Sequence, residues 1–266
     1  MPKTYFLCGS YFETEHFHQL MNYLNKQEWG DHAVLVNKQI GPSQPGGRTP
    51  AGYPIIYNAL LGAAFADPNC ERAWLLGDDV LPELDTLRKT QQVLEADPTI
   101  GVIFPVEFWK SATSALETLD PTTGLPIPIA QALQEGPETT EKLFAGFACA
   151  CITRAAWEAV GPMDVSLGRG YGEDLDFGIR CWKAGYRCVN YRRAAFFHHR
   201  GATYSRCVTE GSYRKEEPYE AATRTKEKWN WLWNGEPEVE TMARVKGWYE
   251  AARVAMKLAA RLEETT

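Results

Sequence analysis

Three carboxylates follow a glycine-rich turn in the stretch Gly170 to Arg180, which reads GYGEDLDFGIR. The glycines let the backbone bring side chains close to a ligand, and a helix beginning near Glu173 would hold those side chains at its positive end. Acidic residues are also favoured in the first turn of any helix, and Asp176 has the spacing of an i,i+4 ion pair with Arg180. Because capping needs only one of them, Glu173 and Asp174 are the candidates for chemistry, and Asp176 is expected to support the structure.

Asp78 and Asp79 form a second acidic pair, directly after the apolar run Ala73 to Gly77. Two carboxylates at the end of a buried strand suit a hard divalent cation, which in turn neutralises a diphosphate. The same two residues could instead form a turn and cap the helix that follows. Both interpretations stay open from this pair alone.

A histidine pair, His198-His199, follows the apolar run Ala194 to Phe197. A neutral imidazole at the end of a strand can ligate a metal, and a cation shared with Asp79 is one interpretation. A single histidine in such a position is more often held by a backbone carbonyl. The pattern does not separate His198 from His199 as the ligand.

The elements that must position these groups alternate between strand and helix. Apolar runs predict buried strands at 5–8, 33–36 and 73–76, and helical spacing predicts helices at 14–26 and 53–66. This order predicts an α/β fold with a largely parallel sheet, because parallel neighbours need crossover helices. Ligands bind at the carboxyl ends of such strands, where the acidic pair at 78–79 is expected.

The rest of the chain continues the pattern less regularly. We expect a helix at 84–96, a strand at 101–105, a Pro-rich loop at 118–140, a strand at 144–153 and a short helix at 154–160. The tail has apolar residues along one face of 239–262. It predicts a C-terminal helix that packs on the body or on a second copy in a homodimer.

Composition excludes several classes. Hydrophobic residues make up 44% and charged residues 23% of the 266 positions, as in an ordinary globular protein. No apolar run approaches the roughly 20 residues of a membrane span, and no signal-peptide core follows Met1, so a cytoplasmic protein is expected. The seven cysteines are odd in number and lack C-x-x-C spacing, which favours reduced, buried thiols over disulfides or a structural zinc site.

The net charge of −6 argues weakly against a general polyanion binder, yet one stretch is basic. Such a stretch suits the phosphates of a nucleotide or of a nucleic acid, and a solvated basic face explains it equally well. Its members lie within 187–215 and are Arg187, Arg192, Arg193, Arg200, Arg206, Arg214 and Lys215.

The order of these motifs resembles family 2 of the nucleotide-sugar glycosyltransferases, especially the rhamnosyltransferase-like branch. The matching segments are Leu75-Leu76-Gly77-Asp78-Asp79, Ile152-Thr153-Arg154, Val160-Gly161-Pro162-Met163-Asp164, Glu173-Asp174-Leu175-Asp176 with Arg180, Gly185-Tyr186 and Phe197-His198. They cover roughly residues 53–204. The N-terminal third departs from the family, since Cys8-Gly9-Ser10-Tyr11 replaces Pro-Thr-Tyr-Asn and Val36-Asn37-Lys38-Gln39 replaces Asp-Asp-Gly-Ser. The donor nucleotide therefore stays open.

The resemblance implies a GT-A fold, a Rossmann-like and mostly parallel central sheet flanked by helices. This catalytic domain would span 1–205, and a C-terminal helical extension would span 206–266. The implied activity is inverting transfer of a sugar from a nucleotide-sugar donor to an acceptor hydroxyl, with a divalent metal, Mn²⁺ or Mg²⁺. A glycan is the default acceptor.

The resemblance also implies roles for individual residues. Asp79 and His198 would ligate the metal, and Asp78 would touch the ribose or the metal. Asp174 would be the general base, with Glu173 its neighbour. Asn58 would face the nucleotide. Apart from the resemblance, Arg192, Arg193 or Arg200 of the basic stretch could assist the metal at the diphosphate.

Three alternatives remain. The basic stretch at 187–215 leaves open glycosylation of hydroxymethylated pyrimidines in viral (phage) DNA. A sugar-phosphate nucleotidyltransferase would carry basic residues after the first strand, and Cys8 to Glu13 has none. A nucleotide-sugar-binding protein without turnover is the third, although retention of Asp79, Glu173, Asp174 and His198 together argues against it.

Overall fold

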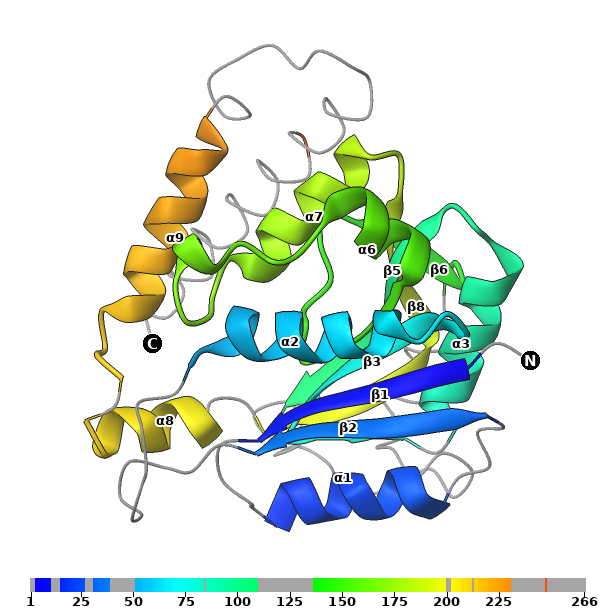
Figure 1. Ribbon diagram of the computed structural model, residues 1–266, viewed down its shortest axis with the longest axis horizontal. Coiled ribbons are helices and arrows are strands. Elements are labelled where there is room, and N and C mark those ends of the chain that lie inside the picture. Colours follow the sequence, from blue (N-terminus) through cyan, green and yellow to red (C-terminus); the bar gives the residue numbers. More distant parts are fainter. Residues whose placement is uncertain are drawn as a thin grey trace.

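The computed structural model describes residues 3–10, 15–26, 31–38, 51–83, 85–109, 136–199, 202–211, 213–230 and 247. The described strands form a single sheet, and helices cover both of its faces (Figure 1). The first half contains β1 (Lys3–Ser10), α1 (Glu15–Lys26), β2 (His32–Lys38), α2 (Tyr53–Ala66), β3 (Cys70–Gly77), β4 (Val80–Pro82), α3 (Thr86–Ala96) and β5 (Ile100–Trp109). The second half contains β6 (Thr139–Lys142), β7 (Cys149–Thr153), α6 (Arg154–Val160), the 3-10 helix η1 (Val165–Leu167), α7 (Glu173–Lys183), β8 (Arg187–His198), α8 (Ala202–Thr209) and α9 (Glu217–Lys228).

The strand order is β2-β1-β3-β7-β5-β8-β4, and β6 pairs with β8. β1 runs parallel to β2 and β3, and β5 runs parallel to β8. β7 lies between these groups and is antiparallel to both β3 and β5. The expected α/β class with helices on both faces is confirmed. The reversed direction of β7 was not expected, because an apolar run shows that a strand is buried and not which way it points.

Alternate residues of the central strands enter two hydrophobic clusters on opposite faces of the sheet. Leu7 and Leu75 pack with Leu61 of α2, on the face that α6 and α7 also cover. Phe6 and Trp74 pack on the other face, against α1 and α3. This period of two along β1 and β3 explains why both strands read as continuous apolar runs: each is buried from both sides.

Most predicted elements form close to their expected bounds, and three differ. β5 extends to Trp109, past the register shift after Pro105. β7 begins only at Cys149, because residues 147–148 form a turn. α3 begins at Thr86, behind Asp85 in the left-handed region at φ 65°. The predicted helix at 239–262 lies outside the described residues, apart from position 247, and so does most of the predicted loop at 118–140.

All seven cysteines are free and buried, as predicted. No helix among the described residues has the length and apolar character needed to cross a membrane. The expected boundary at residue 205 falls within α8, and the division into domains stays a prediction.

Candidate active site

A cavity of about 630 Å³ opens where β1, β3, β5 and β8 reach their carboxyl ends. Both acidic pairs line it, together with a histidine and a fifth acidic residue from β5: Asp78, Asp79, Glu107, Glu173, Asp174 and His198. The structure therefore brings the early and late motifs of the chain to one place. A volume of this size falls within the range of small-molecule sites, about 300–1,000 Å³.

Strand pairing places Asp79 beside His198. After Asp79 the chain enters β4, which pairs antiparallel with the end of β8, and Val80 is the register partner of His198. The backbone N–H of His199 donates to the carbonyl oxygen of Asp79 at 2.9 Å. As a result, His198 Nε2 lies 3.3 Å from Asp79 Oδ1.

Glu107 holds the other side of the same imidazole, with His198 Nδ1 2.7 Å from Glu107 Oε1. Trp109 is the register partner of His198 on β5, so Glu107, two residues earlier, points to the same face of the sheet. Burial alone lowers the pKa of His198, but the hydrogen bonds to Asp79 and Glu107 outweigh it and raise the pKa to about 9. Two carboxylates thus flank one imidazole at the floor of the cavity.

These residues fit a divalent cation. Asp79 Oδ1 and His198 Nε2 lie 3.3 Å apart. One metal ion with metal–ligand bonds of about 2.0–2.2 Å can therefore contact both atoms. The described residues contain no group of three or more His, Cys, Asp or Glu side chains arranged to hold a metal. The protein would therefore supply two ligands, and diphosphate oxygens and water the others, which is the usual arrangement for Mg²⁺-type ions. Glu107 would orient the imidazole from behind.

Asp78 is held differently from its neighbour. Its side chain is buried, and Ser10 Oγ at the end of β1 donates to Asp78 Oδ2 at 3.0 Å. Because Ser10 ends the neighbouring parallel strand, this bond fixes Asp78 at the edge where ligands of such sheets bind.

Glu173 and Asp174 occupy the first turn of α7, and among the described residues neither has an imidazole or hydroxyl partner like those of the first pair. Glu173 is buried, and its Oε2 has no hydrogen-bond partner among the described residues. Asp174 Oδ1 accepts a local bond from the N–H of Leu175 at 2.8 Å. Burial raises the pKa of both carboxyls, and the charge of Asp174 raises that of Glu173 further. Glu173 therefore retains its proton to higher pH, and Asp174 ionises first.

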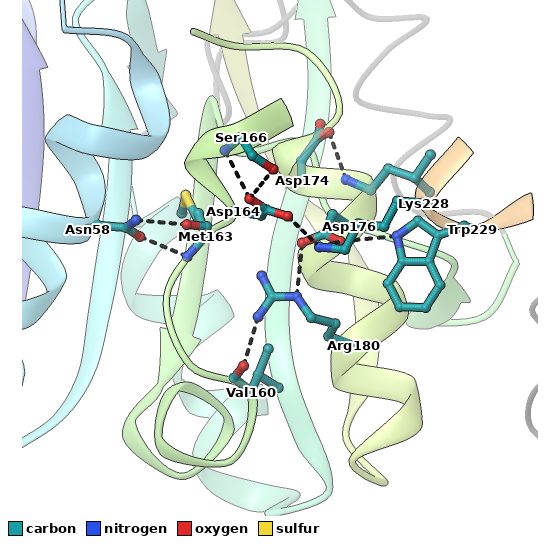
Figure 2. A network of polar contacts seen from close by, with 11 residues as sticks. Asn58, Val160, Met163, Asp164, Ser166, Asp174, Asp176, Arg180, Lys228 and Trp229 are labelled. Carbon is teal, nitrogen blue, oxygen red and sulfur yellow. Dashed lines mark hydrogen bonds and ion pairs between the residues drawn. The ribbon is translucent and has the colours of Figure 1, made fainter. Parts of the chain in front are cut away.

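Several predicted residues lie elsewhere. Asn58 bonds the backbone of Met163 in both directions, at 2.8 Å each, and does not line the cavity (Figure 2). Arg192 lies in the irregular part of β8, where its N–H donates to the carbonyl of Glu138, and it does not line the cavity either. Arg200 is outside the described residues. Of the two histidines, His198 lines the cavity, whereas His199 stacks on His16 with ring centroids 3.5 Å apart.

The described members of the basic stretch are largely engaged within the fold. Arg187 pairs with Asp97 and Glu141, and Arg214 pairs with Glu220 at 2.9 Å. Side chains already neutralised by neighbouring carboxylates give little reason to expect a nucleic-acid surface here.

Sequence reasoning missed three kinds of residue around the cavity. Glu107 was hidden in an apolar strand, although a lone charge there is itself a signal. Tyr53 and Tyr57 stack with ring centroids 4.0 Å apart and form an aromatic wall. Tyr171, between two glycines, lines the rim with a positive φ of 70° and 49% exposure.

Comparison with known proteins agrees with this geometry. The model of "Glycosyl transferase family group 2" matches residues 78–262. The solved mannosyltransferase PcManGT from Pyrobaculum calidifontis, in complex with GDP-Man and Mn²⁺, is 16% identical with a TM-score of 0.53, over 97% of this chain and 80% of that one. TarS of S. aureus is 13% identical with a TM-score of 0.58, over 91% of this chain and 42% of TarS.

At these identities, the two structures show a shared fold. No curated protein sequence matches the chain. The family model spans well over half of the chain, including both acidic pairs and His198, and the chain belongs to glycosyl transferase family group 2.

Proposed function

We propose that this glycosyltransferase moves a sugar from a nucleotide-sugar donor to a hydroxyl of a glycan, with inversion and with the help of a divalent metal. The observation that carries the proposal is the convergence of Asp79, His198, Glu173 and Asp174 around one cavity. The order of its motifs further supports a place in the rhamnosyltransferase-like branch.

The donor side of the site rests on Asp79 and His198, which would hold Mn²⁺ or Mg²⁺. When bound, the ion neutralises the charge that develops on the diphosphate leaving group. The PcManGT structure, a complex with GDP-Man and Mn²⁺, supports a nucleotide sugar and a divalent metal as the occupants of this site. Asp78, which accepts a hydrogen bond from Ser10, would contact the ribose or the metal.

The acceptor side rests on Asp174. The acceptor oxygen attacks the anomeric carbon and forms the new C–O bond, the bond to the diphosphate breaks on the opposite face, and Asp174 takes the hydroxyl proton. Such general-base help is worth roughly 10²- to 10⁴-fold. Glu173, protonated to higher pH, keeps the charge of the pair on Asp174.

A glycan acceptor is favoured over DNA by the surroundings of the cavity. Tyr171 presents a half-exposed ring at the rim, held there in a backbone conformation that non-glycine residues rarely adopt. An aromatic face suits the apolar face of a sugar ring. Arg187 and Arg214, two of the seven basic residues that suggested viral DNA, are paired with carboxylates of the same chain.

The test is transfer and donor hydrolysis across a panel of nucleotide sugars, with Mn²⁺ and with excess chelator. Asp174→Asn should abolish transfer and leave donor binding nearly intact. Asp31→Asn is the matched control, since Asp31 is exposed at the opposite, amino-terminal side of the sheet. Full activity in chelator would eliminate the metal role, and near-normal turnover of Asp174→Asn would eliminate the base. Donor binding without any turnover would support a binding protein instead.

A further inference from the structure

Helix α9 contacts both η1 and α7, and it lies beside α7 in the fold (Figure 1). It belongs to the C-terminal part of the chain, more than 40 residues after Glu173. Its contacts are polar and specific, and they converge on the segment that carries Glu173 and Asp174.

The centre of these contacts is Asp176, which is fully buried on α7 two positions after Asp174. Asp176 Oδ2 accepts from Arg180 Nε at 2.9 Å. Asp176 Oδ1 lies 2.6 Å from Lys228 Nζ and accepts from Trp229 Nε1 at 3.0 Å (Figure 2). A buried carboxylate is stable only with such donors. Of the three partners that the described residues supply, Lys228 and Trp229 lie at the C-terminal end of α9.

Lys228 also reaches the beginning of the loop that leads into α7. Its Nζ donates to Asp164 Oδ2 at 2.7 Å, and Asp164 Oδ1 in turn accepts from the N–H and the hydroxyl of Ser166. One ammonium group therefore joins Asp164, at the start of η1, to Asp176, inside α7 (Figure 2).

Other residues of α9 contact the middle of the loop 164–172, which leads into α7. Glu217 accepts two bonds from Arg169, at 2.9 and 2.6 Å. Arg224 Nε donates to the carbonyl of Leu167 at 2.8 Å. Gly172, at φ 110°, lies so close to Thr225 that a Cβ on it would fall 2.2 Å from the Thr225 hydroxyl.

We infer that Lys228 and Trp229 are positioning residues of the transfer reaction, acting through Asp176 to fix the first turn of α7 and with it the direction of Asp174. The inference rests on the function proposed above. α7 is continuous from Glu173 to Lys183, so a movement of Asp176 moves Asp174 with it. A displacement of about 1 Å at a reacting group can cost about 100-fold in rate.

The metal side of the cavity is built separately. Asp79, His198 and Glu107 are positioned by the pairing of β4, β5 and β8 and by the contacts of His198 with the two carboxylates. Loss of Lys228 should therefore affect the acceptor step and spare the donor. A merely structural role would weaken both.

The test compares Lys228→Met, Lys228→Arg and Trp229→Phe with Lys226→Met, which removes an exposed lysine from the same helix. We expect kcat to fall about 10- to 100-fold in Lys228→Met, with the donor KM and the affinity for nucleoside diphosphate and Mn²⁺ unchanged. Lys228→Arg should recover most of the rate, Trp229→Phe should lose less than Lys228→Met, and Lys226→Met should behave as wild type.

Hydrogen exchange tests the same inference without turnover. Amides of 164–176 should exchange faster in Lys228→Met, and those of β3 and β8 should not. An unchanged kcat in Lys228→Met, or donor affinity that falls in step with kcat, would overturn the inference. If Lys228→Met does not fold, Trp229→Phe decides by the same two criteria. Absence of turnover in the wild type would instead refute the proposed function, and exchange would still report on the contacts of α9.

Discussion

The two acidic pairs of the cavity contain the same kind of side chain and are held in opposite ways. Asp78 and Asp79 sit in a turn between strands, with a hydroxyl beside one and an imidazole beside the other. Glu173 and Asp174 begin a helix, where burial raises the pKa of both. The hydroxyl and the imidazole beside Asp78 and Asp79 stabilise their negative charge, and this pair suits a cation. The burial of Glu173 and Asp174 favours the protonated carboxyl, and this pair suits proton transfer. The two pairs therefore differ in role because their environments differ and not because their residue types do.

After Asp174→Asn, the largest expected effect tests the cation side of this comparison. Asp79→Asn removes a charged ligand, and we expect transfer to fall by about 10²- to 10³-fold. Binding of nucleoside diphosphate should lose its dependence on Mn²⁺, because the ion would join the diphosphate to Asp79. Calorimetric titration with and without Mn²⁺ measures this. If Asp79→Asn bound metal and nucleotide as wild type does, the first pair would not be the cation site.

A smaller effect is expected from Glu107→Gln. The variant keeps the shape of the side chain and weakens its hold on His198 Nδ1, so the affinity for metal should fall about 10- to 100-fold. The matched control is Glu141→Gln, which removes a carboxylate that pairs with Arg187 away from the cavity. Equal metal affinity in both variants would show that Glu107 does not support the site.

The pH dependence of transfer tests the proton side. Burial raises the pKa of Asp174 to about 6, against the opposing backbone hydrogen bond from Leu175. A general base works only when deprotonated, so kcat should rise with pH, about tenfold per unit, until about pH 6 and then level off. A rate profile at saturating donor measures this limb. A limb near the ordinary aspartate value of 3.8 would mean that burial does not act on Asp174.

The last effect is on stability. Burial, and then the charge of Asp174, raise the pKa of Glu173 from 4.5 to about 8. Between these values the folded chain holds a proton that the unfolded chain has released, so stability should fall as pH rises through this interval, by at most about 1.4 kcal/mol per unit.

Glu173→Gln cannot ionise and should lose this slope. Denaturant unfolding of both proteins at pH 5 and pH 8 compares them. Parallel pH dependence in wild type and variant would contradict the buried, protonated state of Glu173.

The local sequence pattern predicted the helices and strands but not how the strands align with one another. The helix at 154–160 and the strand that ends just before Asp78 and Asp79 follow from the spacing of apolar residues and from the residues that flank them, all within a few positions of one another. Glu107 and His198 are 91 positions apart, and their contact depends on how β5 and β8 align after a register shift. No local pattern carries that alignment.

The sequence by itself determined the alternation of strand and helix, the order of the motifs and thereby the family, because burial periodicity and short motifs are written in neighbouring residues. Only the tertiary structure decided that His198 and not His199 enters the cavity, that Asn58 binds the backbone of Met163, and that Lys228 and Trp229 hold Asp176. These outcomes depend on strand register and helix docking, which join residues far apart in the chain through contacts that form only once the sheet is assembled.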